Sequence, residues 1–416
     1  MEKRTTHQKL DIDRIRAIKV LGNGAMGTVF LAYDTSADPS ARFPFALKVV
    51  DKPIMHAKLD ASRRARWEIT VLSGLSHPFL PTLLGSFDGP DLTGWAIPYC
   101  PGGDLNVLRH HQTDRVFSPA VIRFYLSEIV CALDHLHHKG IVYRDLKPEN
   151  VLIQQSGHVT LTDFDLSRKL ALKRVCHGLV RSEPEMLEEC NKAKVRVVKQ
   201  QHSLARILGY GLNNGLKKAK SARVSPVSRQ KMSFVAGERS NSFVGTEEYM
   251  SPEVIHGDGH EFAVDWWALG VLAYEMLHGK TPFLGNSRKE TFRNVLMKRP
   301  EFMGKRTALM DLIERLLEKD PTKRLGYYGG AVEIKEHEFF TGLRWSRLTE
   351  VLRPPFLPPA EEEYLAGKLT AGGFDVRDYF QKLRAPPSAQ PSSLPSGSSE
   401  YQRNILLTEF CQEVLS

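Results

Sequence analysis

The chain has 416 residues, of which 42% are apolar, and a formal net charge of +9. That length and apolar content are sufficient to bury one large domain with appendages, and they exclude a small module held together by disulfides. The five cysteines are odd in number and lack the spacing of metal ligands, which fits reduced thiols in the cytosol or nucleus.

The same composition argues against insertion into a membrane. The N-terminus contains no apolar run that would serve as a signal peptide, and Glu2 stands where N-myristoylation requires glycine. The most apolar stretch, residues 266–274, is too short to span a bilayer. We therefore expect a cytoplasmic or nuclear protein without a transmembrane helix.

A glycine-rich turn is the first element with a chemical signature. Residues 22–29 have the form G-x-G-x-x-G-x-V, and residues 17–21 and 28–32 on either side are rich in β-branched and apolar residues. These flanks predict a β-hairpin, whose glycines let backbone N–H groups approach phosphate oxygens. The alternatives are an ordinary tight turn and a dinucleotide-binding fold, in which the motif would open a helix.

A lysine and a glutamate follow this hairpin. Residues 45–50 read as an apolar strand interrupted by Lys48, and residues 60–75 read as an amphipathic helix that carries Glu68. In one interpretation Glu68 holds Lys48 against the α- and β-phosphates of a nucleotide. In the other, Lys48 is an edge residue and Glu68 is a solvated i,i+4 partner of Arg64.

The most informative stretch is residues 143–150, Tyr-Arg-Asp-Leu-Lys-Pro-Glu-Asn, followed eighteen residues after Asp145 by Asp163-Phe-Asp165. Phosphoryl transfer needs a carboxylate to accept a hydroxyl proton, and cations to neutralise charge on the phosphoryl oxygens. These two segments supply a base, a lysine and two metal ligands. The alternative, a charged surface loop, would have to carry all these side chains by chance.

With these motifs in this order, residues 16–345 resemble the eukaryotic protein kinases. The resemblance implies an α+β fold of two lobes, with a mostly antiparallel sheet and one main helix in the small lobe and a mostly helical large lobe. The organisation it implies is an N-terminal extension (1–15), a small lobe (16–98), a large lobe (99–340) with a basic insertion (170–240), and a C-terminal tail (341–416). The charge and composition of the insertion indicate that it is disordered or orders only on binding.

The resemblance also implies ATP and Mg²⁺ as cofactors and assigns residue roles. Lys48 and Glu68 resemble the ion pair of the active state. Asp145 resembles the catalytic base, and Lys147 a γ-phosphate contact. Asn150 and Asp163 resemble the magnesium ligands. The implied nucleotide-binding residues are Leu21, Gly22, Asn23, Gly24, Ala25, Met26, Gly27, Val29, Ala46, Lys48, Ile97, Cys100 and Asp104. The implied structural residues are Glu253, which would pair with Arg324, and Asp265, which would anchor the catalytic loop.

Further features narrow the resemblance. Tyr143, residues 77–80 (His-Pro-Phe-Leu) and residues 241–246 (Asn-Ser-Phe-Val-Gly-Thr) resemble the AGC serine/threonine kinases. Asp165, where most kinases have glycine, and the long insertion before residue 241 resemble the plant AGC VIII group. Within that group, residues 61–68 and 220–229 look like the UNICORN kinases, which implies a role in plant signalling and growth control.

Asp165 bears on whether the enzyme is active. Glycine at this position gives the backbone freedom to flip the metal-binding aspartate. Aspartate removes some of that freedom and leaves Asp163 intact, so we expect normal turnover with a less populated inactive state. The alternatives are a pseudokinase scaffold and a tethering module.

Regulation and substrate choice follow from the same resemblance. Ser242 stands where AGC kinases carry an activating phosphate, and Arg144 could bind that phosphate. Asp104, Glu149 and Glu275 fall where basophilic relatives face basic residues of the protein substrate. Each also has a plainer interpretation: Asp104 as a helix cap, Glu149 as a ribose contact and Glu275 as a buried partner.

The basic charge is concentrated in one window. Residues 191–231 contain eleven Lys or Arg and no Asp or Glu, so the whole positive excess of the chain lies there. The interpretations are a solvated linker, an import-receptor signal around residues 217–220, and attraction to anionic phospholipids of the plasma membrane. Nucleic-acid binding is disfavoured because Tyr210 is the only aromatic residue available for base stacking.

The tail contains a Pro/Ser-rich linker at residues 386–399 and an apolar cluster at residues 405–410. AGC kinases end with an F-x-x-F motif that docks on the small lobe. Here Leu407 replaces the first aromatic of that motif and six residues follow Phe410. Docking of an upstream phosphoinositide-dependent kinase therefore stays an open expectation.

Overall fold

The computed structural model describes residues 9–24, 26–36, 38, 42–55, 61–170, 246–350, 354–358, 369 and 372–384. Several sequence-based expectations lie outside these residues. They are the role of Ala25, the phosphorylation site Ser242, the basic window 191–231 and the terminal apolar cluster 405–410.

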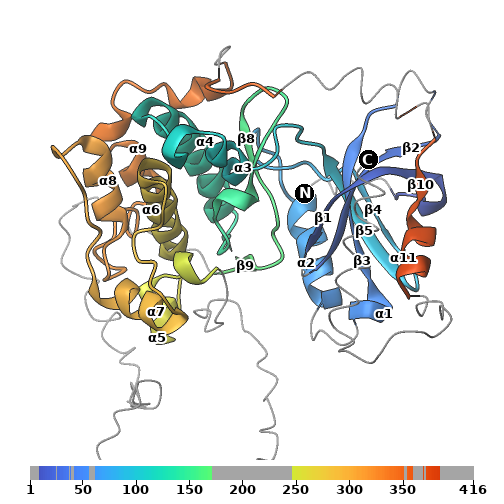
Figure 1. Cartoon of the computed structure of the whole chain (residues 1–416), viewed down its shortest axis with the longest axis horizontal. Coiled ribbons are helices and arrows are strands. Elements are labelled where there is room, and N and C mark those ends of the chain that lie inside the picture. The colour runs from blue at the N-terminus through green and yellow to red at the C-terminus, as the bar shows by residue number, and fades with distance from the viewer. Residues whose placement is uncertain are drawn as a thin grey trace, which may run out of the picture. The chain divides into compact units, whose positions relative to one another are not determined.

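The N-terminal part is built on a six-stranded sheet in the order β10-β1-β2-β3-β5-β4, in which all neighbours are antiparallel (Figure 1). Its strands are β1 (Ile15–Gly24), β2 (Gly27–Asp34), β3 (Phe45–Asp51), β4 (Gly85–Asp88), β5 (Leu92–Pro98) and β10 (Phe374–Asp375). The predicted hairpin is present, because β1 pairs with β2 down to Gly24 opposite Gly27. The glycine-rich segment therefore does not lead into a helix, which excludes the dinucleotide-binding alternative.

Strand register decides which residues share a face of this sheet. Lys48 lies opposite Val29 on one side and Trp95 on the other, and Ala46 lies opposite Ile97. Because side chains alternate along a strand, these residues form one face, and residues such as Phe30 and Leu47 form the other. The first face carries the candidate nucleotide site, and the second is buried in a separate apolar cluster.

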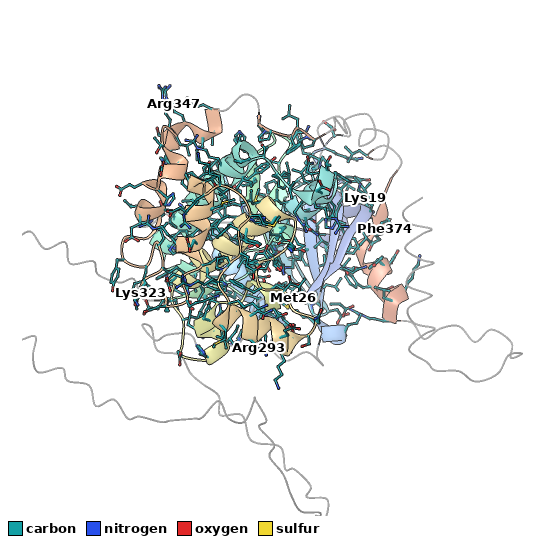
Figure 2. The ribbon with its side chains drawn as sticks, turned by 60° about the vertical axis from the view of Figure 1, so that its left-hand side comes forward. Lys19, Met26, Arg293, Lys323, Arg347 and Phe374 are labelled. Atoms are coloured by element: carbon teal, nitrogen blue, oxygen red, sulfur yellow. The ribbon has the colours of Figure 1, made fainter. Side chains whose placement is uncertain are left out.

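That second face is covered by part of the C-terminal tail, which was predicted as a segment separate from the small lobe. Strand β10 pairs with β1 at Ala17↔Phe374, and helix α11 (Val376–Arg384) follows directly (Figure 2). Tyr379 and Phe380 are buried, and their rings lie 5.1 Å and 5.9 Å from the ring of Phe30. The tail docks because a short amphipathic helix can bury three apolar side chains on an otherwise exposed sheet.

Helices α1 (Lys52–Met55) and α2 (Ala61–Ser73) follow β3 in the chain. The helix predicted over residues 60–75 is α2, which ends two residues earlier than expected. Ala65 and Leu72 of its predicted apolar face are buried. Glu68 is buried with them at 3% exposure, so this carboxylate is not solvated.

The C-terminal part is mostly helical (Figure 1). Its α-helices are α3 (Leu105–His110), α4 (Pro119–His138), α5 (Pro252–His256), α6 (Ala263–His278), α7 (Arg288–Met297), α8 (Ala308–Leu316) and α9 (Ala331–Lys335). Short strands β6 (Ile141–Val142) and β9 (Arg168–Lys169) pair with each other, as do β7 (Val151–Ile153) and β8 (Val159–Leu161). The predicted α+β fold, an antiparallel sheet followed by a helical part, is confirmed.

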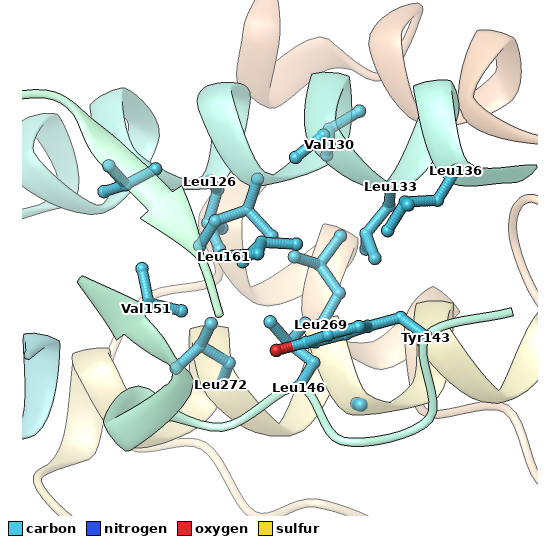
Figure 3. Packing of buried hydrophobic residues seen from close by; sticks show 14 of the residues in the cluster. Leu126, Val130, Leu133, Leu136, Tyr143, Leu146, Val151, Leu161, Leu269 and Leu272 are labelled. Carbon is cyan, nitrogen blue, oxygen red and sulfur yellow. The ribbon is translucent and has the colours of Figure 1, made fainter. Parts of the chain in front are cut away.

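The core of the helical part lies between α4 and α6. Leu126, Leu133 and Leu136 of α4 face Leu269 and Leu272 of α6, and Tyr143 and Leu146 lie beside these two α6 residues (Figure 3). Helix α6 is apolar around nearly its whole circumference, which is typical of a helix buried on all sides. Among the described residues, no helix combines the length and apolarity needed to cross a bilayer.

Candidate active site

The β7–β8 hairpin brings the two most informative motifs together. Asn150 immediately precedes β7 and Thr162 immediately follows β8, and Val151 pairs with Leu161. The Thr162 backbone N–H donates to the Asn150 carbonyl oxygen at 3.0 Å. Asp163 therefore lies beside the end of the 143–150 segment because both flank the same pair of strands.

Asp265 of α6 anchors the backbone of the 143–150 segment. The Asp265 carboxylate, whose side chain has no solvent exposure, accepts from the backbone N–H of Tyr143 at 2.9 Å and from that of Arg144 at 2.8 Å. It also bonds His137 Nε2 at 2.7 Å. Arg144 has φ of 70°, a left-handed conformation that a non-glycine residue holds only under surrounding constraint. The two bonds from the loop backbone to Asp265 supply that constraint, and the bond to His137 orients the Asp265 carboxylate.

Asp145 is held in a polar pocket of its own loop. Lys147 Nζ lies 2.9 Å from Asp145 Oδ2, and the Asn150 side-chain nitrogen donates to the same oxygen at 2.8 Å. Burial raises the pKa of Asp145, and the charge of Lys147 only partly offsets this rise. A carboxylate with a raised pKa is a stronger proton acceptor, as a general base requires.

Lys48 joins the sheet to both acidic partners. Its Nζ lies 2.9 Å from Glu68 Oε2 on α2 and 2.7 Å from Asp163 Oδ1. Burial alone would lower the pKa of Lys48, but Glu68 and Asp163 raise it above its usual range. Burial and the bond to Lys48 also contradict the alternative that Glu68 is a solvated partner of Arg64. Arg64 instead pairs with Asp165, at 2.6 Å.

Asp163 and Asn150 fit a magnesium ion by their chemistry. Burial acts to raise the pKa of Asp163, but the charge and hydrogen bond of Lys48 outweigh it, and the pKa lies below its usual range. Asp163 would thus offer an anionic oxygen to a cation. The Asn150 side-chain nitrogen donates to the Asp145 carbonyl and carboxylate, which orients the Asn150 amide and leaves its oxygen as the ligand atom. Carboxylate and amide oxygens are the donors that Mg²⁺ prefers.

The predicted adenine and phosphate residues line the Lys48 face of the sheet. Ala46 and Ile97 are cross-strand neighbours on this face. Gly27 has φ of 146°, and a Cβ there would lie 2.2 Å from the Val49 carbonyl oxygen, so glycine is required for β2 to approach β3. A Cβ on Gly22 would meet nothing within 4 Å, which leaves the loop surface above it open.

Three other residues predicted to bind the nucleotide have side chains that are buried or bonded elsewhere. Met26 is 7% exposed and belongs to the main apolar core, so only its backbone remains for a nucleotide. Asp104 caps α3, its Oδ1 accepting from the Val107 N–H at 2.8 Å. Cys100 is buried, and burial raises the pKa of its thiol to about 12, which makes it an apolar rather than a reactive group.

Glu253 and Arg324 form a buried bidentate ion pair. Arg324 Nη1 and Nη2 donate to the two Glu253 carboxylate oxygens at 2.7 Å and 2.9 Å. Arg324 also donates to the carbonyl oxygens of Ala263 at 2.9 Å and Glu318 at 3.0 Å. The pair ties the segment that begins α5 to the loop after α8.

A family model for the protein kinase domain matches residues 15–197 and 199–340. The chain belongs to the protein kinase family. It is 57% identical to serine/threonine-protein kinase UCNL of Arabidopsis thaliana, over 96% of each chain. It is 56% identical to serine/threonine-protein kinase UCN of the same plant, over 92% of this chain and 93% of that protein. It is 42% identical to the Arabidopsis kinase OXI1, over 96% of this chain and 91% of that protein. The predicted resemblance to plant AGC-type serine/threonine kinases is confirmed.

The acidic residues predicted to face the protein substrate differ in burial and in hydrogen-bond partners. Glu275 is buried, pairs with Arg109 Nη2 at 2.9 Å and accepts a hydrogen bond from the Tyr249 hydroxyl. The plainer interpretations therefore hold for Glu275 as a buried partner and for Asp104 as a helix cap. Glu149 is exposed.

Two contacts between α2 and the segment after Asp163 were not predicted from the sequence. Arg64 pairs with Asp165, and Trp67 Nε1 donates to Ser167 Oγ at 3.0 Å. Asp165 departs from the kinase pattern and so indicated an unusual contact. Its partner, Arg64, could not be predicted because the two residues are far apart in the sequence. The docking of β10 and α11 was also missed, because three apolar residues in a short helix are a weak sequence signal.

Proposed function

We propose that this kinase transfers the γ-phosphoryl group of ATP to serine or threonine hydroxyls of proteins. The observation that carries the proposal is the position of Lys48 Nζ, within 2.9 Å of Glu68 and 2.7 Å of Asp163. Strand β3, helix α2 and the β7–β8 hairpin thereby converge on one cation. The similarity to the serine/threonine-protein kinases UCNL and UCN supports the same activity.

Each residue has a defined task in this proposal. Asp145 accepts the proton of the acceptor hydroxyl, and its raised pKa suits it to that step. Lys147 and Lys48 hold phosphate oxygens, and Glu68 keeps Lys48 in place. Mg²⁺ bound to Asn150 and Asp163 would neutralise charge on the phosphates. A silent scaffold is not favoured, because the chain retains the base, both lysines and both metal ligands.

Transfer of radiolabelled phosphate by the purified chain tests this proposal. Lys48→Met and Asp145→Asn should each lower the rate by about 10²-fold or more, since each removes a group that acts in the transition state. Lys52→Met is the matched control. Lys52 is also a lysine of the small lobe, but it pairs with Asp88 away from Lys48. Wild-type activity no higher than that of Asp145→Asn would show that the proposal is wrong.

We also propose that phosphorylation of Ser242 activates the enzyme and that Arg144 binds the phosphate. Arg144 immediately precedes Asp145, and its Nε donates to the Leu166 carbonyl oxygen at 2.7 Å, so a half-buried guanidinium lies beside the segment that follows Asp163. Burial and, next, the like charge of Arg168 lower the pKa of Arg144 to about 10. A phosphate dianion bound to Arg144 would offset both effects through charge-assisted hydrogen bonds. Ser242→Ala should lose most activity, whereas Ser240→Ala should not. Equal activity of the two variants would contradict the mechanism.

Selection of basic residues near the target serine is proposed as well. Exposed Glu149 is the acidic side chain best placed for it, since Asp104 and Glu275 already have partners. Phosphorylation of arrayed peptides by wild type and by Glu149→Gln would measure the preference. No change in the preference for basic residues would remove Glu149 from this role.

The remaining proposals concern partners and location. We propose that residues 191–231 direct the kinase either to the nucleus through an import receptor or to anionic phospholipids. A fluorescent reporter fused to residues 170–240 would settle at one of these places, and diffuse fluorescence would favour a plain linker. Deletion of residues 401–416, followed by measurement of Ser242 phosphorylation by a phosphoinositide-dependent kinase, tests whether the tail recruits that activator.

A further inference from the structure

The Asp165 carboxylate is buried and paired. Its side chain is 5% exposed, and Oδ2 lies 2.6 Å from Nη2 of Arg64 on α2. A buried carboxylate without a partner is strongly destabilising, so this pair holds two elements together. Glycine, which stands at this position in most kinases, has no side chain that could make the contact.

A second contact joins the same two segments. Trp67 Nε1 donates to Ser167 Oγ at 3.0 Å, and Ser167 Oγ in turn donates to the Phe164 carbonyl oxygen at 2.6 Å. Residues three or four apart lie on one face of a helix, so Arg64, Trp67 and Glu68 project from the same side of α2. That one side contacts Asp165, Ser167 and Lys48.

We propose that Asp165 is a positioning residue that holds α2 through Arg64 and so keeps Glu68 in contact with Lys48. The proposal rests on the proposed kinase function. If α2 moved away from the Asp163–Ser167 segment, it would lose its contacts with Asp165, Ser167 and Lys48 together. Asp165 therefore shifts the equilibrium of α2 toward the docked state, in which the lysine–glutamate pair is complete.

The contact differs from the role first expected of Asp165. Loss of glycine at this position was expected to act through backbone stiffness alone. A backbone effect would be the same for any residue with a Cβ, whereas an ion pair requires the carboxylate and Arg64. Asparagine separates the two, because it keeps the size and the Cβ of aspartate and removes the charge.

The test compares Asp165→Asn, Arg64→Gln and the double variant in the full chain. Each single variant should lower kcat about 10-fold, and the double variant should fall no further, because both remove one contact. The KM for peptide should stay unchanged, since neither residue faces the acceptor. Arg64→Lys should restore most of the rate. The control is Arg66→Ala, because Arg66 is an arginine of the same helix whose side chain is exposed.

Hydrogen exchange supplies a readout besides activity. In Asp165→Asn and Arg64→Gln, amides of residues 61–73 should exchange faster than in wild type, with α4 and α6 unchanged. Unchanged exchange in α2, or a double variant whose kcat falls by the product of the single effects, would overturn the proposal. If wild type were no more active than Asp145→Asn, the kinase function would fail, and the exchange of α2 would still decide the positioning role.

Discussion

Arg324 is the most completely buried cation among the described residues, and its loss should have a large effect. Its side chain has no solvent exposure and makes four hydrogen bonds, two of them to Glu253. Burial by itself would raise the pKa of Glu253, but the bonds from Arg324 outweigh it and lower the pKa. Glu253 is therefore ionised at neutral pH and meets Arg324 as a carboxylate.

The magnitude follows from the partner left behind. Glu253→Ala leaves the Arg324 guanidinium in the interior with carbonyl contacts only, and removing one partner of a buried pair costs about 3–5 kcal/mol. In a domain of this size such a loss lowers the melting temperature by about 10 °C. The double variant Glu253→Ala with Arg324→Met should be more stable than Glu253→Ala alone, because no unpaired charge remains buried.

Urea denaturation followed by circular dichroism measures these differences. Lys323→Ala is the matched control, since Lys323 is adjacent to Arg324 but 74% exposed in its side chain. Its unfolding free energy should stay within about 0.5 kcal/mol of wild type. The explanation would be refuted if Glu253→Ala lost no more unfolding free energy than Lys323→Ala, or if the double variant were less stable than Glu253→Ala.

Three further predictions concern other parts of the kinase. Asp265→Asn should lower kcat about 10²-fold with little change in the KM for ATP, because it loosens the backbone next to Asp145 and leaves the nucleotide-binding face of the sheet intact. A KM for ATP that rises as much as kcat falls would argue against this. Phe380→Ala should reduce the unfolding free energy by about 3 kcal/mol, whereas Leu357→Ala, at an exposed site, should change it by less than about 0.5 kcal/mol; similar values for the two would mean that α11 is not docked. Burial, together with the charge of Arg144, lowers the pKa of His260 to about 4, so the unfolded chain binds this proton first and stability falls as pH drops from 6.5 toward 4, by up to about 1.4 kcal/mol per pH unit. His260→Gln should flatten that slope in denaturation curves measured across this range, and an unchanged slope would exclude His260 as its source.

Local sequence was sufficient wherever function depends on neighbouring residues. We could predict the glycine-rich hairpin and the α2 helix because strands and amphipathic helices each have a characteristic spacing of apolar residues. We could also predict the 143–150 segment, because its functional side chains are close together in the sequence. The family could be predicted for the same reason, since the order of these motifs is specific. Asp265 and the Glu253–Arg324 pair were named only through the family resemblance, because residues more than seventy positions apart show no local pattern that links them.

Tertiary structure alone decided which charges meet. Arg64 could have paired with Glu68 one helical turn away, but Glu68 is buried toward Lys48 and Arg64 reaches Asp165. Likewise, the tail helix α11 could have stayed in solvent, but the sheet offered an uncovered apolar face that its aromatic residues fill. Pairing and docking of this kind depend on which surfaces the fold leaves unburied, and that is a property of the packed molecule rather than of any stretch of its sequence.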